Sequence, residues 1–208
     1  MKKIFSALLL VWITGFAGAS AAAVQPPQDL IKQTADRMLA KLKEERAVIR
    51  KDPGRIYELV SDIVLPHFDF ERMSAWVLGK HWRTATPDQK KRFTEEFRNL
   101  LVRTYATSLT EYTDRKINYL PFRGDANATD VTVRTEVEQP GAAAIPIDYS
   151  LILKNGEWLV YDVAIDNVSL VTNYRSTFAN EIRQGGLDKL ISKLAERNRQ
   201  STTAANSK

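Results

Sequence analysis

The chain lacks cysteine, and only two of its 208 residues are histidine. Without cysteine the protein has no disulfides, no thiol nucleophile and no attachment point for a lipoprotein-type lipid anchor. The two histidines, His67 and His81, show neither H-E-x-x-H nor another metal-ligand spacing, so we expect no metal site. The sequence therefore predicts a protein stabilised by its apolar core, without disulfides or bound metal.

Glycine-rich phosphate loops and nucleophile motifs are also missing. The glycines are isolated apart from Gly185–Gly186, which we interpret as a helix break. Ser169 lacks the G-x-S-x-G surroundings of a hydrolase nucleophile, and its place between a strand and a helix favours helix capping. We therefore predict no catalytic residue and no cofactor. One alternative stays open, an enzyme in which Asp148 or Asp162 is an acid–base carboxylate in a conical pocket.

A long uncharged apolar run occurs only near the N-terminus. Lys2–Lys3 precede the apolar stretch Ile4–Ile13, and small residues with A-x-A spacing follow. This pattern predicts a cleavable signal peptide over residues 1–23, so we expect an exported, soluble protein. Loss of the two leader lysines lowers the formal net charge from +5 to +3, which is too small to indicate nucleic-acid binding.

The rest of the chain changes its hydrophobic period twice. Apolar residues first recur at helical spacing, with charged residues on the opposite face. They then alternate as in strands, and helical spacing resumes near the C-terminus. Thr86 and Gln89 form a capping box, and Asn155–Gly156 is typical of a two-residue hairpin turn. The expected helices are 28–52, 55–65, 68–79, 86–112, 169–183 and 187–199, and the expected strands are 116–122, 129–139, 144–154 and 157–165.

This order predicts an α+β fold, a four-stranded, mainly antiparallel sheet with amphipathic helices packed around it. We expect one domain over residues 24–200 and a disordered polar tail over 201–208. In the last strand, strict alternation places Leu159, Tyr161, Val163 and Ile165 on one face. Periodicity leaves open whether the space between sheet and helices is filled or hollow.

Two motif groups resemble the MlaC family, also called toluene-tolerance proteins. The first group, L-G-x-x-W, A-T-x-x-Q, F-x-x-x-F, L-L and T-Y-A, runs from Leu78 to Ala106. The second lies in EWLVYDVAIDNVSLVTNYRSTF, which ends at Phe178. Asn167 departs from the glycine more often expected there, but asparagine also tolerates a left-handed turn. The resemblance covers residues 28 to about 197.

The resemblance implies a periplasmic phospholipid carrier that maintains outer-membrane lipid asymmetry and is not an enzyme. Its acyl chains would occupy an apolar cavity enclosed by sheet and helices. The implied partners are a phospholipid, an inner-membrane ABC-type lipid transporter with its periplasmic lipid-binding subunit, and an outer-membrane lipoprotein–porin complex. The resemblance also implies that the protein is a monomer and that it does not bind nucleic acid. A second alternative, a carrier or chaperone for acylated proteins, would use a similar cavity.

Such a carrier must cover both lipid tails. A diacyl lipid has about 30 methylenes, and leaving them in water at about 0.8 kcal/mol each would cost on the order of 24 kcal/mol. The head group can stay in water, where arginine or lysine at the rim can contact its phosphate. From strand alternation and helical spacing we predict that the tails are lined by Leu101, Tyr105, Val133, Tyr149, Leu151, Tyr161, Val163, Leu170, Tyr174 and Phe178.

Overall fold

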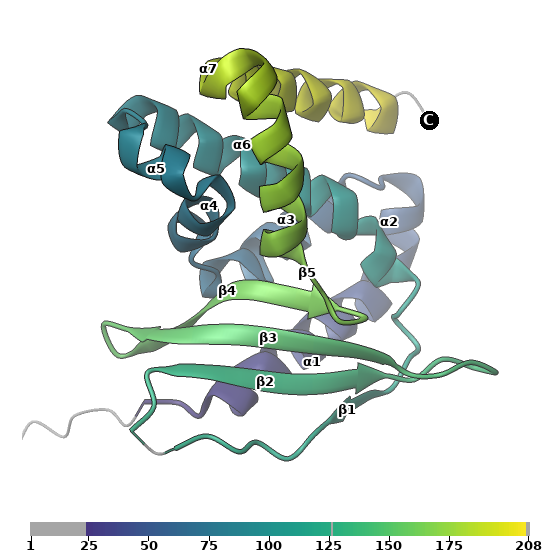
Figure 1. Cartoon of the computed structure of the whole chain (residues 1–208). Coiled ribbons are helices and arrows are strands. Elements are labelled where there is room, and N and C mark those ends of the chain that lie inside the picture. The colour runs from purple at the N-terminus through teal and green to yellow at the C-terminus, as the bar shows by residue number, and fades with distance from the viewer. Residues whose placement is uncertain (1–23, 126, 207–208) are drawn as a thin grey trace, which may run out of the picture.

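The computed structural model describes residues 24–125 and 127–206, and the predicted signal peptide lies outside them. Helices precede and follow an antiparallel sheet, which confirms the predicted α+β class (Figure 1). The helices are α1 (Pro27–Glu44), α2 (Arg46–Lys51), α3 (Arg55–Ile63), α4 (Phe70–Leu78), α5 (Lys80–Thr84), α6 (Pro87–Tyr105) and α7 (Leu170–Asn206), with 3₁₀ helices η1 (Leu65–His67) and η2 (Thr107–Thr110).

The first expected helix, 28–52, is divided into α1 and α2 at Glu45. The backbone of Glu45 leaves the helical conformation, with φ of −97° and ψ of 14°. Its carboxylate accepts hydrogen bonds from Arg55 Nε at 2.6 Å and Nη2 at 3.2 Å, at the start of α3. Periodicity predicts the apolar stripe but does not detect this ion pair, which accompanies the turn of the chain.

Helices α4, α6 and α7 start within two residues of their expected starts, but α6 ends at Tyr105 instead of Tyr112, and the five-residue α5 is not predicted. The capping box of α6 is confirmed, because Gln89 N donates to Thr86 Oγ1 at 3.2 Å and Thr86 N donates to Gln89 Oε1 at 3.0 Å. Helix α7 bends at Gly186, whose φ of 79° is not helical. The helix then continues to Asn206, into the segment from residue 201 that the sequence predicts as a tail.

Five strands form the sheet, not the predicted four. They run in the order β1-β2-β3-β4-β5, and all neighbouring pairs are antiparallel. The additional strand has two residues, too few for alternation to predict it. It follows a turn in which Asp166 and Asn167 have φ of 50° and 63°. The strands are β1 (Ile117–Tyr119), β2 (Asp130–Val137), β3 (Ile145–Lys154), β4 (Glu157–Ile165) and β5 (Val168–Ser169).

The predicted alternation of β4 is wrong, because the strand contains a β-bulge. Ser150 of β3 pairs with Asp162, but the next residue, Leu151, pairs with Val160, which leaves Tyr161 as the extra residue. Val160 and Val163 therefore belong to the same apolar cluster, while Tyr161 belongs to another. Alternation assumes an unbroken ladder and cannot locate such an insertion.

Helices cover the sheet from two directions (Figure 1). Helix α1 lies behind the sheet in this view, where its Leu30 and Ile31 join the cluster that contains Val131 and Val133 of β2. Helices α4, α6 and α7 lie beyond the β4–β5 edge. At that edge Asp69 N donates to Val160 O at 2.9 Å and so connects the start of α4 to the sheet.

Buried apolar residues form three clusters. The helical cluster is centred on α4, α6 and α7, the sheet cluster lies between α1 and the sheet, and a third joins α1 to α3. The buried members of the helical cluster are Met73, Val77, Leu78, Phe93, Phe97, Leu100, Leu101, Tyr161, Val171, Phe178, Ile182, Leu190, Ile191 and Leu194. Those of the sheet cluster are Leu30, Ile31, Val131, Val133, Leu151, Trp158, Val160 and Val163.

We predict that Gly79→Ala destabilises the fold by about 1–3 kcal/mol, measured by urea unfolding. Gly79 has φ of 54° and ψ of −118°, and an added Cβ would lie 3.2 Å from Arg175 Nη2. Gly185→Ala is the matched control, because Gly185 lies within α7 and its Cβ would meet only the flexible side chain of Lys189. Equal loss of stability in both variants would contradict this explanation.

Candidate functional site

The ten predicted lining residues do not form one surface. Val133, Leu151 and Val163 are buried in the sheet cluster, and the partly buried Tyr149 packs against them. Leu170 contacts both clusters and lies between them. The five other residues belong to the helical cluster or pack against it: Leu101, Tyr105, Tyr161, Tyr174 and Phe178.

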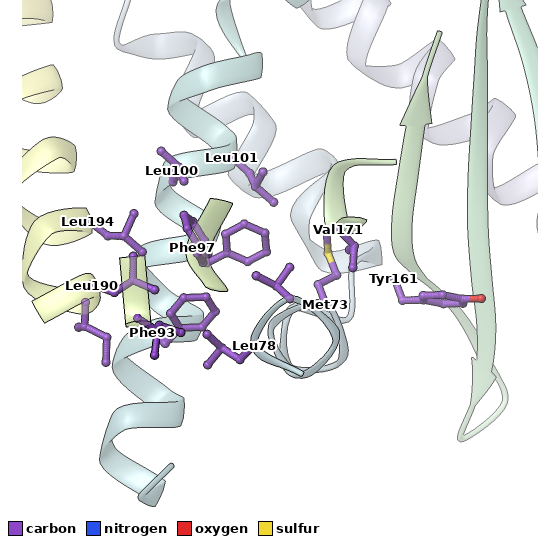
Figure 2. Packing of buried hydrophobic residues seen from close by; sticks show 14 residues of the cluster. Met73, Leu78, Phe93, Phe97, Leu100, Leu101, Tyr161, Val171, Leu190 and Leu194 are labelled. Atoms are coloured by element: carbon purple, nitrogen blue, oxygen red, sulfur yellow. The ribbon is translucent and has the colours of Figure 1, made fainter. Parts of the chain in front are cut away.

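The helical cluster is densely packed with aromatic rings. Phe93 and Phe97 have no exposed surface, and their ring centroids lie 5.7 Å apart. Phe178 stands edge-on to both rings, at 5.8 Å and 6.0 Å. Figure 2 shows Phe93 and Phe97 between the helices, with Tyr161 apart from them on the strand side. The contacts are those of a solid core, which favours a structural role for this cluster.

The sheet cluster has a larger share of partly buried members than the helical cluster. Its centre is buried, with Leu151 at 0% and Val133 at 1% exposure. Around that centre lie apolar side chains that are only partly buried, including Phe68, Phe122, Ile147, Tyr149 and Leu170. An apolar cluster with such a border has side chains that can move without opening the whole fold.

Two tyrosines place hydroxyl groups beside this apolar cluster. Burial, together with the nearby Asp36 carboxylate, raises the pKa of Tyr119 to about 12. Burial also raises the pKa of Tyr149. Among the described residues, none provides a hydrogen-bond partner for the buried hydroxyl of Tyr119. A bound molecule with ester or hydroxyl oxygens could accept a hydrogen bond there, because unpaired buried hydroxyls are rare.

A pocket of about 680 Å³ opens beside the sheet cluster. This volume falls within the roughly 300–1,000 Å³ that is usual for ligand pockets. Phe122, Ala128 and Val131 line the pocket and also contact or belong to the sheet cluster. The other lining residues are Leu120, Pro121, Arg123, Gly124, Asp125, Asp130, Thr132 and Arg134.

None of the ten predicted residues lines this pocket. Its wall is formed by the segment between β1 and β2 and by the first residues of β2. The expected strand 116–122 ends early, because β1 stops at Tyr119 and leaves Leu120 to Asp125 outside the ladder. The turn residues Gly124 and Asp125 signal a loop in the sequence, but alternation cannot show that this loop stands beside the apolar cluster.

A second set of contacts joins α4 to the sheet beside the same pocket. The hydroxyl of Tyr161 donates to Asp130 Oδ1 at 2.9 Å, and Arg72 Nη2 lies 3.9 Å from Asp130 Oδ2. The Arg72 guanidinium lies over the Tyr161 ring at 4.7 Å and near the half-exposed Trp76. Burial and the neighbouring Asp130 raise the pKa of Tyr161.

Asp162 and Ser169 form a capping network rather than a catalytic pair. Asp162 Oδ2 accepts from Ser169 Oγ at 2.5 Å, and its Oδ1 accepts from the backbone N of Val163 at 2.9 Å and of Val171 at 3.1 Å. Ser169 Oγ in turn accepts from Thr172 N at 3.0 Å. The predicted helix-capping role of Ser169 is thus confirmed. Three donors thus occupy the Asp162 carboxylate, which accounts for its position without a chemical role.

The part of the chain that the structure describes contains neither a metal-binding cluster nor a membrane-spanning helix. Within it, no group of three or more histidine and acidic side chains is placed to hold a metal ion. No helix there has the length and apolar character needed to cross a membrane.

The fold and the site define an α+β protein with a sheet-lined apolar cluster beside an open pocket. Residues 32–196 match the family model of MlaC protein. The chain belongs to the MlaC protein family.

Individual relatives match over most of their length. The intermembrane phospholipid transport system binding protein MlaC of Haemophilus influenzae is 27% identical over 94% of this chain and 93% of that protein. The toluene tolerance protein ttg2D of Pseudomonas putida is 30% identical over 88% of this chain and 86% of its own. A phospholipid-binding protein from Ralstonia solanacearum, solved in complex with a phospholipid, is 32% identical, with a TM-score of 0.79, over 86% of this chain and 99% of that chain.

We predict that Asp162→Asn lowers the free energy of unfolding by about 1–2 kcal/mol, because it weakens the cap of α7. The measurement is chemical denaturation followed by circular dichroism. Asp148→Asn is the control, since Asp148 lies half-buried on β3 opposite Arg134, away from any helix end. If Asp162→Asn left stability unchanged, the capping role would be wrong, and a chemical role for this carboxylate would need to be reconsidered.

Proposed function

We propose that this protein binds a phospholipid and carries it through the periplasm, with the acyl chains held in the sheet cluster. The observation that carries the proposal is the position of that cluster, which is apolar, incompletely closed and adjacent to a pocket of about 680 Å³. The names of the relatives support the ligand class, because two of them are described as binding or transporting phospholipid.

The sheet cluster suits acyl chains better than the helical cluster does. Acyl chains need apolar surfaces that can separate from each other. Displacing the closely packed rings of Phe93, Phe97 and Phe178 would remove the centre of the helical core. In the sheet cluster, the partly buried side chains outnumber the buried ones, and Leu170 connects this cluster to the helices. Of the ten predicted lining residues, we therefore retain Val133, Tyr149, Leu151, Val163 and Leu170 as first candidates.

The carrier would act without catalysis and without a cofactor. We propose that it is exported by its signal peptide and that it moves lipid between the inner and outer membranes, which maintains the lipid asymmetry of the outer membrane. Its partners would then be an inner-membrane ABC-type transporter with its periplasmic lipid-binding subunit and an outer-membrane lipoprotein–porin complex. The relative described as part of an intermembrane phospholipid transport system supports this route.

We predict that Val163→Phe lowers the phospholipid that copurifies with the exported protein to a small fraction of the wild-type level. The larger side chain fills the sheet cluster while keeping it apolar, and such overpacking costs about 1–3 kcal/mol of stability without unfolding the domain. Native mass spectrometry followed by lipid extraction measures the bound molecule. The same extraction distinguishes a diacyl phospholipid from an acylated protein as the natural cargo.

Ile182→Phe is the matched control, because Ile182 and Val163 are equally buried, at 8% exposure, but lie in different clusters. It should cost similar stability and leave bound lipid unchanged. Leu101→Phe tests the helical set of predicted residues in the same way. If Leu101→Phe removed lipid and Val163→Phe did not, the acyl chains would lie in the helical cluster and our placement would be wrong.

A further inference from the structure

The 680 Å³ pocket is lined by four charged side chains, and only some of them have hydrogen-bond or ion-pair partners within the part of the protein that the structure describes. Its two carboxylates have partners: Asp125 Oδ1 accepts from Asn127 N at 2.9 Å, and Asp130 accepts from the Tyr161 hydroxyl and lies near Arg72. In contrast, neither Arg123 nor Arg134 has an ion pair or a side-chain hydrogen bond with another described residue. Both guanidinium groups thus remain available to an anion.

These two arginines stand in different elements that meet at the pocket. Arg134 projects from the polar face of β2, where its neighbours Thr132 and Glu136 are exposed or half-buried, and Arg123 belongs to the segment after β1. Leu120 N donates to Arg134 O at 3.0 Å, which fixes this segment beside β2. The pair is therefore positioned by backbone contacts and not by a carboxylate between them.

Part of the pocket lining is apolar and borders the sheet cluster. Phe122 lies at this boundary, because it lines the pocket and also packs against the cluster. Its ring folds back over Gly124, where an added Cβ would lie only 2.2 Å from Cζ of Phe122. The separation between the pocket and the apolar cluster thus includes one aromatic side chain on a loop, which a ligand can displace.

We propose that this pocket receives the phosphate of the bound phospholipid, with Arg123 and Arg134 as its ligands and Phe122 at the passage of the tails into the sheet cluster. The inference rests on the proposed phospholipid-binding function. Guanidinium groups suit this task because they remain charged and can donate two parallel hydrogen bonds to phosphate oxygens. A diacyl molecule with one anionic group matches a site with two free cations at one end and an apolar cluster at the other.

The test compares two lipids with the same acyl chains, phosphatidylglycerol and diacylglycerol, offered to the full exported chain after its lipid is removed. Each lipid is supplied from detergent micelles, and its uptake is measured by native mass spectrometry. We expect Arg123→Gln/Arg134→Gln to bind phosphatidylglycerol roughly 10- to 100-fold more weakly, as loss of charge-assisted hydrogen bonds implies, and to bind diacylglycerol as the wild type does. The double lysine variant should recover part of the loss.

The control removes the same charge elsewhere. Arg98→Gln/Arg103→Gln changes two arginines that line a separate groove between α3 and α6, and it should leave both lipids unaffected. Unchanged phosphatidylglycerol affinity in Arg123→Gln/Arg134→Gln would overturn the phosphate site while the carrier function stands. Failure of the wild-type chain to take up any phospholipid would instead overturn the proposed function.

Inorganic phosphate separates a lipid phosphate from a free anion. We expect phosphate alone to bind the lipid-free protein weakly, because most of the affinity of an amphiphile comes from its tails. Tight binding of inorganic phosphate that depends on Arg123 and Arg134, with no preference between phosphatidylglycerol and diacylglycerol, would assign the pocket to a free anion. That result would overturn the proposal.

Discussion

The bulge at Tyr161 is the constraint on which the organisation of the protein depends. In an unbroken strand, Tyr161 and Val163 would share a face, and Val160 would lie on the opposite one. The extra residue instead returns Val160 to the face of Val163 and places Tyr161 in the helical cluster. One strand therefore joins two cores with different packing. Tyr161 also reaches Asp130 at the pocket, which links α4, the sheet and the pocket through a single side chain.

Local sequence signals predict most of the elements and few of the contacts between them. The capping box of α6, the stop at Gly79, the bend at Gly186 and the turn at Asn155–Gly156 all depend on the chemistry of neighbouring residues, and all four are present. The break between α1 and α2 depends on Arg55, ten positions after Glu45. Strand β5 has only two residues, so hydrophobic alternation cannot predict it. Such features arise from tertiary contacts, which a single sequence does not contain explicitly.

The candidate site shows the same limit more strongly. Alternation and helical spacing identify residues that are apolar and inward-facing, and Val133, Leu151 and Val163 are indeed buried together. They cannot assign residues to one of two clusters, because both clusters use the same residue types. No sequence pattern distinguishes the two arginines of the pocket from other charged surface residues. Only the fold shows that Asp125 and Asp130 already have partners and that Arg123 and Arg134 stand together at the pocket.

The incomplete closure of the sheet cluster also answers a thermodynamic requirement of a carrier. Shielding about 30 methylenes would contribute on the order of 24 kcal/mol, which exceeds the roughly 18–21 kcal/mol limit of known non-covalent affinities. Relative to water, a rigid, hollow cavity would hold a diacyl lipid at that limit, and release into water would be negligible. In the proposed function, residues of the sheet cluster that pack on one another without ligand would lose those contacts on binding, and the loss would offset part of the gain. The helical cluster keeps its own aromatic packing and can preserve the fold while the sheet cluster changes.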